Sequence, residues 1–460
     1  MKQRVTYSPR LRPGNELNLD QVRVSRDSLA VIGIDAAKEH RITLGFEELS
    51  QELWVVLKRC HEFRLRWTSP LPYDASPPLV SRVSSGLHVL YTPRDQEKSV
   101  PICSMLKKLF GTEVQCADSE HTFSKFPLLS ERFSGSASFQ AWFQVPSLNQ
   151  LKTYLDNTVP RPYHREIASL IDINYLDVDC DNLSHTCIIN AFWAHAPRKG
   201  LWAERLYQKV PGESLEVGIL SEEESSDLEE IALHGLLTVI GEDDKPRKSL
   251  TPPSESCALH TYLTLPSALF IDKYQLQDPL FLASQNLIKL HSISGATDLE
   301  APDWAIKQWG SAVLLELAYP SPPPSQTSQE WTVSVPLHLR YLDATANSSG
   351  MSSVQMPWPV VFWACNAEEG TKMSVNPFDR TNLGYDGLFG PRTMFYHVPP
   401  RQNESGWLVE TIPVPVLDLD RAWYVEWGTM LAIFAGFSWV VWKLVKVLRN
   451  TGSQSQKKRE

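Results

Sequence analysis

The sequence lacks the short motifs that mark common enzyme classes. Its 460 residues contain no GxSxG, HExxH, P-loop or dinucleotide-binding fingerprint. Positive charge is also scarce, because 44 lysines and arginines stand against 53 aspartates and glutamates, a formal net charge of −9. Nucleic-acid binding requires a basic surface, so this balance argues against it. We therefore expect no cofactor, no metal ion and no catalytic residues of a familiar type.

Cysteine is sparse, with seven residues in the chain and neither a CxxC motif nor paired zinc-ligand spacing. In an oxidising compartment, Cys103 with Cys116 or Cys180 with Cys187 would bridge neighbouring strands. The odd count leaves at least one thiol unpaired or intermolecular. Spacing alone does not assign the connectivity.

The N-terminus lacks the apolar stretch of a cleavable signal peptide. Residues 1–18 read MKQRVTYSPRLRPGNELN, which carries charge but no hydrophobic core. Two routes into a membrane stay open for such a chain. Either a C-terminal apolar segment acts as a reverse signal anchor and draws the preceding chain across, or the topology is inverted.

One long apolar run is present near the C-terminus and predicts a transmembrane helix at residues 423–447. Its central 19 residues, Trp427 to Val445, contain a single charge, Lys443. A helix of this length spans roughly 28 Å, which matches the hydrocarbon core of a bilayer. Tryptophan and tyrosine flank both ends, as the two membrane interfaces require. The alternative is a buried helix of a soluble core.

Flanking charge predicts the orientation of this helix. Basic residues dominate after it, whereas acidic residues outnumber basic ones between Glu410 and Glu426. Positive charge stays in the cytosol, so residues 448–460 form a cytosolic tail and the body is lumenal. Lys457 and Lys458 lie fourth and third from the C-terminus, the register of a dilysine signal for retrieval to the endoplasmic reticulum. Ordinary juxtamembrane basic charge is the alternative interpretation, but the register, the orientation and the short tail together favour the endoplasmic reticulum.

Three glycosylation sequons agree with a lumenal body. They begin at Asn182, Asn347 and Asn403. Each is weak by itself because the pattern is common. Asn347 is the best candidate, since it lies in the polar run ATANSSGMSS.

Pattern and composition predict a mainly β protein with some α, in two β-rich lumenal domains followed by the single helix. Residues 1–240 form an α+β domain, 241–256 a linker of charge, proline and serine, and 257–420 a second domain. Strands are predicted at 28–34, 41–46, 62–67 and 87–92, with an amphipathic helix at 47–59. Further strands are predicted at 258–265, 311–319, 330–342 and 359–365. Their succession without intervening helices favours a β-sandwich.

One acidic cluster has a catalytic interpretation. Asp177, Asp179 and Asp181 alternate along a strand-like segment, as in the DxD element with which many glycosyltransferases hold a divalent ion. A lumenal glycosyltransferase is therefore the alternative function. The simpler interpretation places three carboxylates on the wet face of a strand, with Val178 and Cys180 facing inward. His260 and His338 lie within strand patterns, where structural roles are the more common.

Three segments of the second domain resemble sequence elements of the PIG-X family. Residues 265–276 read LPSALFIDKYQL, residues 298–302 read DLEAP, and residues 336–341 read PLHLRY. They resemble the family patterns LPxxL(F/Y)xDxYxL, (D)xEAP and PxHxRY in the same order, ahead of a single C-terminal helix. The additional N-terminal half resembles the fungal, PBN-type branch of the family.

The resemblance implies a function that motifs alone do not supply. PIG-X-like proteins are non-catalytic subunits of GPI mannosyltransferase I in the endoplasmic reticulum. They stabilise a PIG-M-type catalytic subunit, which transfers the first mannose to the GPI-anchor precursor. Fungal members are also described as chaperone-like. The resemblance thus implies an accessory protein rather than an enzyme.

Such a subunit would act through contacts with its partner. In the helix, Gly428, Ala432, Ala435 and Gly436 are small enough to allow close approach of a second helix, although they could equally face lipid. Near the family elements, Tyr274 and Trp304 are candidate interface anchors, and Phe270 is the likelier core residue. His338 and Arg340 share one strand face, where they are expected to pair with Asp272 or Glu300.

Overall fold

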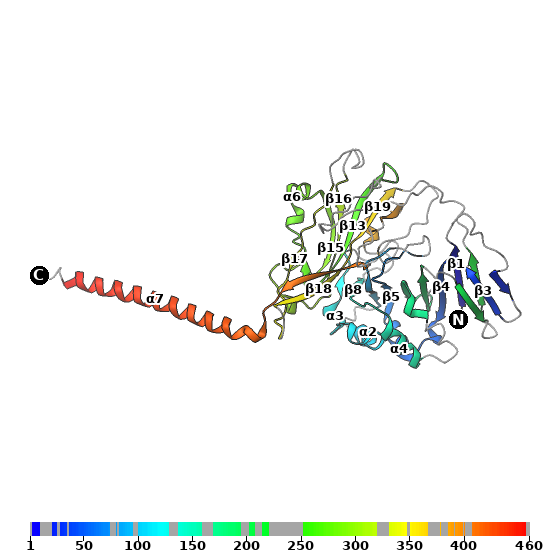
Figure 1. Cartoon of the computed structure of the whole chain (residues 1–460), viewed down its shortest axis with the longest axis horizontal. Coiled ribbons are helices and arrows are strands. Elements are labelled where there is room, and N and C mark those ends of the chain that lie inside the picture. Colours follow the sequence, from blue (N-terminus) through cyan, green and yellow to red (C-terminus); the bar gives the residue numbers. More distant parts are fainter. Residues whose placement is uncertain are drawn as a thin grey trace. The chain divides into compact units, whose positions relative to one another are not determined.

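The computed structural model describes most of the chain. The described residues are 2–9, 21–24, 28–34, 36–73, 80, 82–94, 100–127, 137–158, 169–194, 202–207, 214–219, 252–319, 331–346, 350–366, 378, 385–390, 392–398, 400 and 407–456. The protein comprises two compact units, one of residues 1–340 and 355–411 and the other of residues 341–354 and 412–460. The predicted class, mainly β with some α, is confirmed (Figure 1).

A nine-stranded sheet dominates the N-terminal half. Its strand order is β12-β1-β4-β10-β9-β5-β6-β8-β7, and neighbouring strands are antiparallel except for β1 with β12. The bounds are β1 Lys2–Pro9, β4 Ala36–Gly45, β5 Cys60–Thr68, β6 Gly86–Pro93, β7 Ser124–Lys125, β8 Phe139–Phe143, β9 Tyr175–Asp181, β10 Thr186–Trp193 and β12 Ser214–Ile219. A smaller sheet pairs β2 (Val22–Val24), β3 (Ser28–Ile34) and β11 (Trp202–Tyr207). The four strands predicted in this half are all present.

Short helices cover one face of the nine-stranded sheet. They are α1 (Gln51–Leu57), α2 (Ile102–Phe110), α3 (Ser119–Thr122) and α4 (Asn149–Thr158). Apolar residues of α1, α2 and α4 share one core with the inward side chains of β5 and β6. The helix predicted at 47–59 is shorter than expected, because residues 46–48 form a separate 3-10 turn and Leu49 is extended.

A five-stranded antiparallel sheet forms the centre of the C-terminal half, in the order β15-β16-β13-β19-β20. Its strands are β13 Cys257–Pro266, β15 Leu287–Gly295, β16 Gly310–Leu317, β19 Val360–Asn366 and β20 Thr393–Val398. Three of them match the strands predicted at 258–265, 311–319 and 359–365. A short helix that was not predicted, α6 (Pro279–Ser284), precedes β15. It starts where the Asp278 carboxylate accepts a hydrogen bond from the Leu280 N–H and proline occupies the first turn.

The strand predicted at 330–342 is largely wrong. Only His338–Leu339 (β17) is a strand, paired with Leu269–Phe270 (β14). Pro336 has no N–H to donate to a ladder. The segment before it is held instead by individual contacts, such as the Ser334 N–H donated to the Gln285 carbonyl at 3.2 Å.

The two large sheets pack against each other through one face of the five-stranded sheet. Leu90 of β6 and Phe126 share a core with Tyr262, Leu314 and Phe362. Hydrogen bonds also join the two halves of the chain at this contact, and in one of them Thr264 Oγ1 donates to Ser84 Oγ at 3.0 Å. The layers of the sandwich therefore come from both halves of the chain. The domain division at 241–256 stays a prediction, since most of that segment lies outside the described residues.

Two of the three disulfides join neighbouring strands, whereas Cys103 lies on helix α2, so the expectation that Cys103–Cys116 bridges strands is wrong. Cys103–Cys116 and Cys180–Cys187 are disulfides, as the spacing suggested, and Cys257–Cys365 is a third between opposed residues of β13 and β19. Cys60 is the free thiol. It is buried, and burial raises its pKa to about 12, so it behaves as a small core residue.

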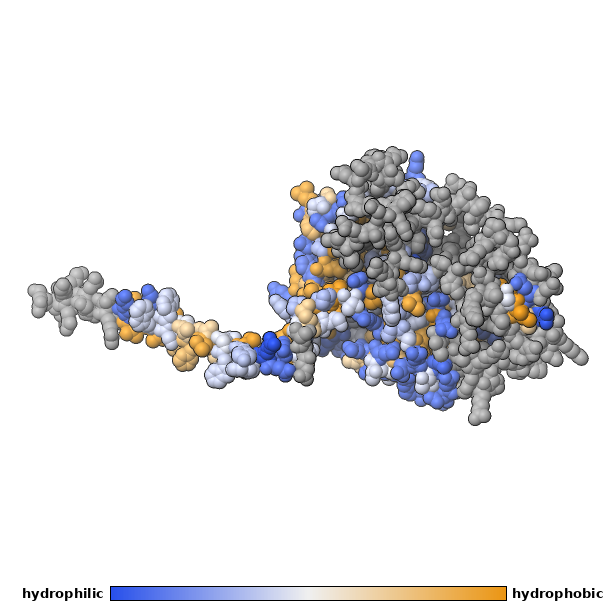
Figure 2. Space-filling view, in the orientation of Figure 1, coloured by the Kyte–Doolittle hydropathy of each residue, from blue (hydrophilic) through white to orange (hydrophobic). Residues whose placement is uncertain are grey.

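The second unit contains the apolar helix. Helix α7 spans Ala422–Gln456, and Leu419–Val447 is long and apolar enough to cross a membrane, with a mean hydropathy of 1.6. No part of the most apolar stretch of this helix is buried, whereas a core helix of a soluble protein is mostly buried. Figure 2 shows apolar side chains along most of α7. The ammonium of Lys443 lies over the Trp439 and Trp442 rings, 5.5 and 5.6 Å from their centroids. The prediction of one C-terminal helix fit to span a membrane is confirmed.

Candidate functional site

The three segments at 265–276, 298–302 and 336–341 converge at one place in the fold. Phe270 on β14 lies opposite His338 on β17, and the Arg340 N–H donates to the Ala268 carbonyl at 2.8 Å. The Arg340 guanidinium reaches the remaining segment, donating from Nη1 to the Ala301 carbonyl at 2.7 Å. We call residues 268–276, 298–304 and 338–340 the motif cluster. Three stretches that are separate in sequence thus form one structural site.

Arg340 lies at the centre of the motif cluster. Only 3% of the residue is exposed, and its guanidinium lies 4.4 Å from the centroid of the Phe270 ring. The other partner of that ring is His338, stacked with a centroid distance of 5.2 Å. Burial lowers the pKa of Arg340, while Asp298 and Asp303 raise it. A cation held on an aromatic face and a carbonyl braces the cluster from inside.

The expected pairing of His338 and Arg340 with Asp272 or Glu300 is wrong. His338 Nε2 lies 3.4 Å from the Gln275 amide oxygen, and Arg340 binds a main-chain carbonyl. The Asp272 carboxylate instead accepts the Tyr274 N–H at 2.8 Å. Aspartate favours such local turns because its short side chain reaches the backbone two residues on.

Asp298 has the same role in the second segment. Its carboxylate accepts the N–H groups of Glu300 and Ala301 at 3.0 and 3.3 Å, and these bonds lower its pKa. The Asp272 and Asp298 carboxylates therefore shape the loops of the motif cluster. This arrangement fits a rigid scaffold better than acid–base chemistry, which needs a carboxylate free to exchange a proton.

Aromatic side chains project from this scaffold. Tyr274 is 61% exposed and Trp304 58% exposed, whereas Phe270 is buried. Leu280 of α6 and Leu339 of β17 are exposed in the same part of the fold. Exposed aromatic anchors on a braced support are typical of protein interfaces. Whether Tyr274 and Trp304 bind a partner stays a prediction.

The carboxylates of β9 have a different environment from the one expected. Asp177 is buried and accepts two hydrogen bonds from Arg64, at 2.9 Å from Nε and 2.7 Å from Nη2. Arg66 lies 3.8 Å from the same carboxylate. The placement of Asp177 on a wet face is therefore wrong, although Asp179 and Asp181 are partly exposed. Two arginines beside a carboxylate disfavour a divalent cation there.

Sequence reasoning missed the partner of Asp177, although a signal was present. Arg64 and Arg66 alternate with apolar residues in the predicted strand at 62–67, which places both on one face. Antiparallel pairing then sets Arg66 opposite Asp177 and Arg64 opposite Asp179. One strand has arginine and the other has aspartate at every second position, so the two strands have complementary charges on the same face.

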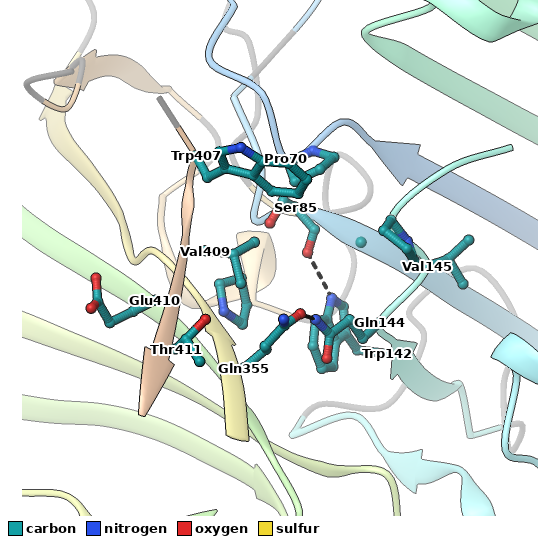
Figure 3. A pocket seen from close by; sticks show the side chains of 13 residues that line it. Pro70, Ser85, Trp142, Gln144, Val145, Gln355, Trp407, Val409, Glu410 and Thr411 are labelled. Atoms are coloured by element: carbon teal, nitrogen blue, oxygen red, sulfur yellow. Dashed lines mark hydrogen bonds between the residues drawn. The ribbon is translucent and has the colours of Figure 1, made fainter. Parts of the chain in front are cut away.

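An open cleft of about 490 Å³ lies near one end of β6 and β8 (Figure 3). Its lining includes Trp407, Trp142, Gln144, Gln355 and Glu410. The side-chain amides of Gln144 and Gln355 bond to each other, and the Trp142 indole donates to the Ser85 carbonyl at 3.0 Å. Among the described residues that line it, Glu410 is the one ionisable side chain. The cleft can bind through an indole face and amides, but it offers no nucleophile–base pair.

The other predicted site residues are half-buried, exposed or outside the described residues. Asn182 lies in the β9–β10 turn beside exposed Leu183 and Ser184, which suits a glycosylation acceptor. Asn347, Asn403, Lys457 and Lys458 lie outside the described residues. The small residues of α7 are exposed along the helix, and a Cβ built on Gly428 or Gly436 meets nothing within 4 Å.

Comparison with known proteins decides the family. The family model described as PIG-X / PBN1 matches residues 232–445. Protein pbn1 of Emericella nidulans is 42% identical over all of this chain and 98% of its own length. The chain belongs to the PIG-X / PBN1 family. Protein pbn1 of Aspergillus oryzae is 40% identical, over 100% of this chain and 98% of its own, and that of Neurospora crassa is 38% identical, over 99% and 97%.

The family assignment confirms the resemblance seen in the sequence. The matched region contains the motif cluster, the five-stranded sheet and most of α7. The likeness to the pbn1 relatives named above also covers residues 1–231, which contain all nine strands of the nine-stranded sheet. This PIG-X / PBN1 protein therefore shares both halves of its sandwich with them.

Proposed function

We propose that this protein is a non-catalytic, stabilising subunit of the GPI mannosyltransferase I complex, needed for transfer of the first mannose to the GPI-anchor precursor. The observation that carries the proposal is its similarity to PBN1 proteins over the whole chain. A chaperone-like role toward other proteins of the endoplasmic reticulum is part of the same proposal. The glycosyltransferase alternative is weakened, because Arg64 already occupies the Asp177 carboxylate.

The proposed setting is the membrane of the endoplasmic reticulum. Helix α7 would cross it once, with the body lumenal and the tail with Lys457 and Lys458 cytosolic. Acidic residues before the helix and basic residues after it support this orientation. Glycosylation at Asn182, Asn347 or Asn403 would report a lumenal body. Treatment of the protein with an endoglycosidase should increase its gel mobility, and N182Q, N347Q and N403Q would assign the site.

The proposed partner is a PIG-M-type catalytic subunit. Tyr274 and Trp304 of the motif cluster would contact it outside the membrane, and Gly428, Ala432, Ala435 and Gly436 would contact it within. Gly428, Ala432 and Gly436 recur every four residues and so share a helix face, and Ala435 follows Ala432 by three residues at the edge of that face.

A pull-down tests the proposal directly. The protein is solubilised in detergent with an epitope inserted at residues 221–230, which keeps the C-terminal dilysine register intact. We expect a PIG-M-type mannosyltransferase to co-purify in stoichiometric amount and to disappear from membranes when this protein is depleted. A preparation without any mannosyltransferase would overturn the proposal.

Matched variants then locate the contact. Y274A and W304A should each reduce recovery of the partner at unchanged protein level. W54A is the control, since Trp54 is also exposed but lies on α1, away from the motif cluster. Equal recovery with all three variants would remove Tyr274 and Trp304 from the interface without touching the family assignment.

A further inference from the structure

Three potential metal ligands meet on neighbouring strands of the five-stranded sheet. His260 on β13 lies opposite Glu316 on β16, and His291 belongs to β15 on the far side of β16. One ligand atom from each of the three residues lies within 4.8 Å of the other two. Among the described residues, this is the one such group of histidine, cysteine, aspartate and glutamate. It plays no part in the motif cluster or the cleft.

His260 is held in an orientation suited to a ligand. Its Nδ1 lies 3.0 Å from the Ala258 carbonyl, so the Nδ1–H donates there and the lone pair remains on Nε2. The residue is 3% exposed and stacks on Phe362, with a centroid distance of 5.6 Å. Phe389 meets the same ring edge-on at 5.1 Å. Metal-binding histidines typically donate their second N–H to a carbonyl in this way.

His291 and Glu316 supply the other two ligand atoms. Nε2 of His291 lies 2.9 Å from Oε2 of Glu316. The register of β15 shifts between Leu290 and Ser292, so His291 lies in a β-bulge. Bulges re-aim side chains and are frequent beside functional sites. Both side chains are about one-fifth exposed on an edge strand and its neighbour, which gives an ion a path to the buried His260.

We propose that His260, His291 and Glu316 form a binding site for Zn²⁺. Two imidazole nitrogens and one carboxylate oxygen are a ligand set that zinc prefers over calcium or magnesium, which favour oxygen alone. Zinc–ligand distances of about 2.0–2.2 Å place tetrahedral ligand atoms roughly 3.3 Å apart. The His291–Glu316 pair, whose two atoms lie 2.9 Å apart, opens slightly to reach that spacing, and His260 closes on it by a side-chain adjustment. The fourth position is left to water or another small ligand.

The site would join three adjacent strands through one ion. It does not depend on the proposed role in GPI-anchor synthesis, and either proposal can fail without the other. Without an ion, the same residues form a hydrogen-bonded His291–Glu316 pair beside a stacked imidazole. The two states differ in whether Nε2 of His260 has a partner, which a metal titration detects.

Zinc binding is measured on the full chain in detergent, purified without a polyhistidine tag and stripped with a chelator. Zn²⁺ is titrated in competition with a chromophoric chelator at neutral pH. We expect one ion per chain with a dissociation constant in the micromolar range or tighter. H291Q and E316Q should each weaken binding at least about tenfold, since even indirect partners of metal ligands cost 10–100-fold. H338Q is the matched control, because His338 lies in the same half of the chain outside the site, and it should bind like the unmodified protein.

A second measurement does not depend on the folding of any variant. X-ray absorption of the zinc-loaded, unmodified protein should show nitrogen and oxygen ligands at about 2.0–2.1 Å with imidazole scattering. The proposal would be overturned if the protein did not bind zinc stoichiometrically. It would also be overturned if H291Q and E316Q bound zinc as tightly as the unmodified protein, or if the spectrum showed no imidazole.

Discussion

The nine-stranded and five-stranded sheets bury ionisable side chains in different ways. On the nine-stranded sheet the Asp177 carboxylate is matched by Arg64 on the next strand, at 2.7 Å. On the five-stranded sheet the buried group is His260, whose single hydrogen bond among the described residues goes to its own strand. The first arrangement pairs the buried carboxylate with cations on the next strand. The second leaves the Nε2 lone pair of His260 available as an acceptor. This nitrogen can therefore bind a metal ion, whereas the Asp177 carboxylate already binds Arg64.

The disulfides show a related contrast. Cys180–Cys187 closes a hairpin of the nine-stranded sheet, with a sequence separation of 7. Cys257–Cys365 joins adjacent strands of the five-stranded sheet across a separation of 108. A crosslink that closes a longer loop removes more conformational entropy from the unfolded chain. The five-stranded sheet should therefore depend more on its disulfide.

The largest expected effect comes from removing that long-range crosslink. The double variant C257A/C365A should lower the free energy of unfolding by about 5 kcal/mol, because the lost disulfide closes a loop of 108 residues and constrains the unfolded chain accordingly. The matched double variant C180A/C187A should cost about 2.5 kcal/mol on the same grounds. Denaturant unfolding of both proteins measures the difference. Equal losses would show that loop entropy does not govern the contrast between the two sheets.

Breaking the buried ion pair is next in size. D177N leaves Arg64 and Arg66 buried without their carboxylate, and should lower the free energy of unfolding by about 3–5 kcal/mol. The control is D179N/D181N, which keeps Asp177 and changes the partly exposed carboxylates. If Asp179 and Asp181 held a catalytic metal, the D179N/D181N protein would lose glycosyltransferase activity while remaining folded. A stable, fully functional control alongside an unstable D177N supports the structural role.

A third prediction concerns acid. Burial, with a smaller contribution from the charge of Arg66, lowers the pKa of His88 to about 4, although the hydrogen bond to the Ser84 carbonyl opposes the shift. The unfolded chain takes up this proton near pH 6.5, so stability is complete above that pH and is lost as pH falls toward 4. Between pH 7 and pH 5 the loss from His88 is about 2 kcal/mol.

Comparison with H88Q measures this contribution. The variant has no imidazole to protonate at this position. Between pH 7 and pH 5 its free energy of unfolding should therefore fall by about 2 kcal/mol less than that of the unmodified protein. Parallel pH profiles for the two proteins would contradict the assignment to His88.

The smallest expected effect on stability lies in the exposed aromatics of the motif cluster. Y274A and W304A should each change the free energy of unfolding by no more than about 0.5 kcal/mol, because both side chains are more than half exposed. The same variants should reduce recovery of the mannosyltransferase partner. A large loss of stability would assign these residues to the scaffold and not to its surface.

Local patterns predicted local structure well. The apolar-rich segments at 258–265 and 359–365 form β13 and β19, and the apolar run after Trp427 forms most of α7. The prediction at 330–342 failed because Pro336 cannot join a ladder, although the neighbouring residues have strand propensity. The helix α6 was missed for the opposite reason. It has only six residues, too few to show a helical period, and its start depends on the Asp278 cap.

The sequence by itself determined the class of the protein, its apolar C-terminal helix and its family, because each depends on composition, periodicity or motifs within one stretch of chain. Only the tertiary structure decided which distant residues meet. Arg64 and Asp177 are 113 residues apart, Arg340 and Ala301 are 39 apart, and His260 and Glu316 meet across two strands. Such contacts follow from strand order and register. These depend on the packing of the whole sandwich, and no single segment carries that information.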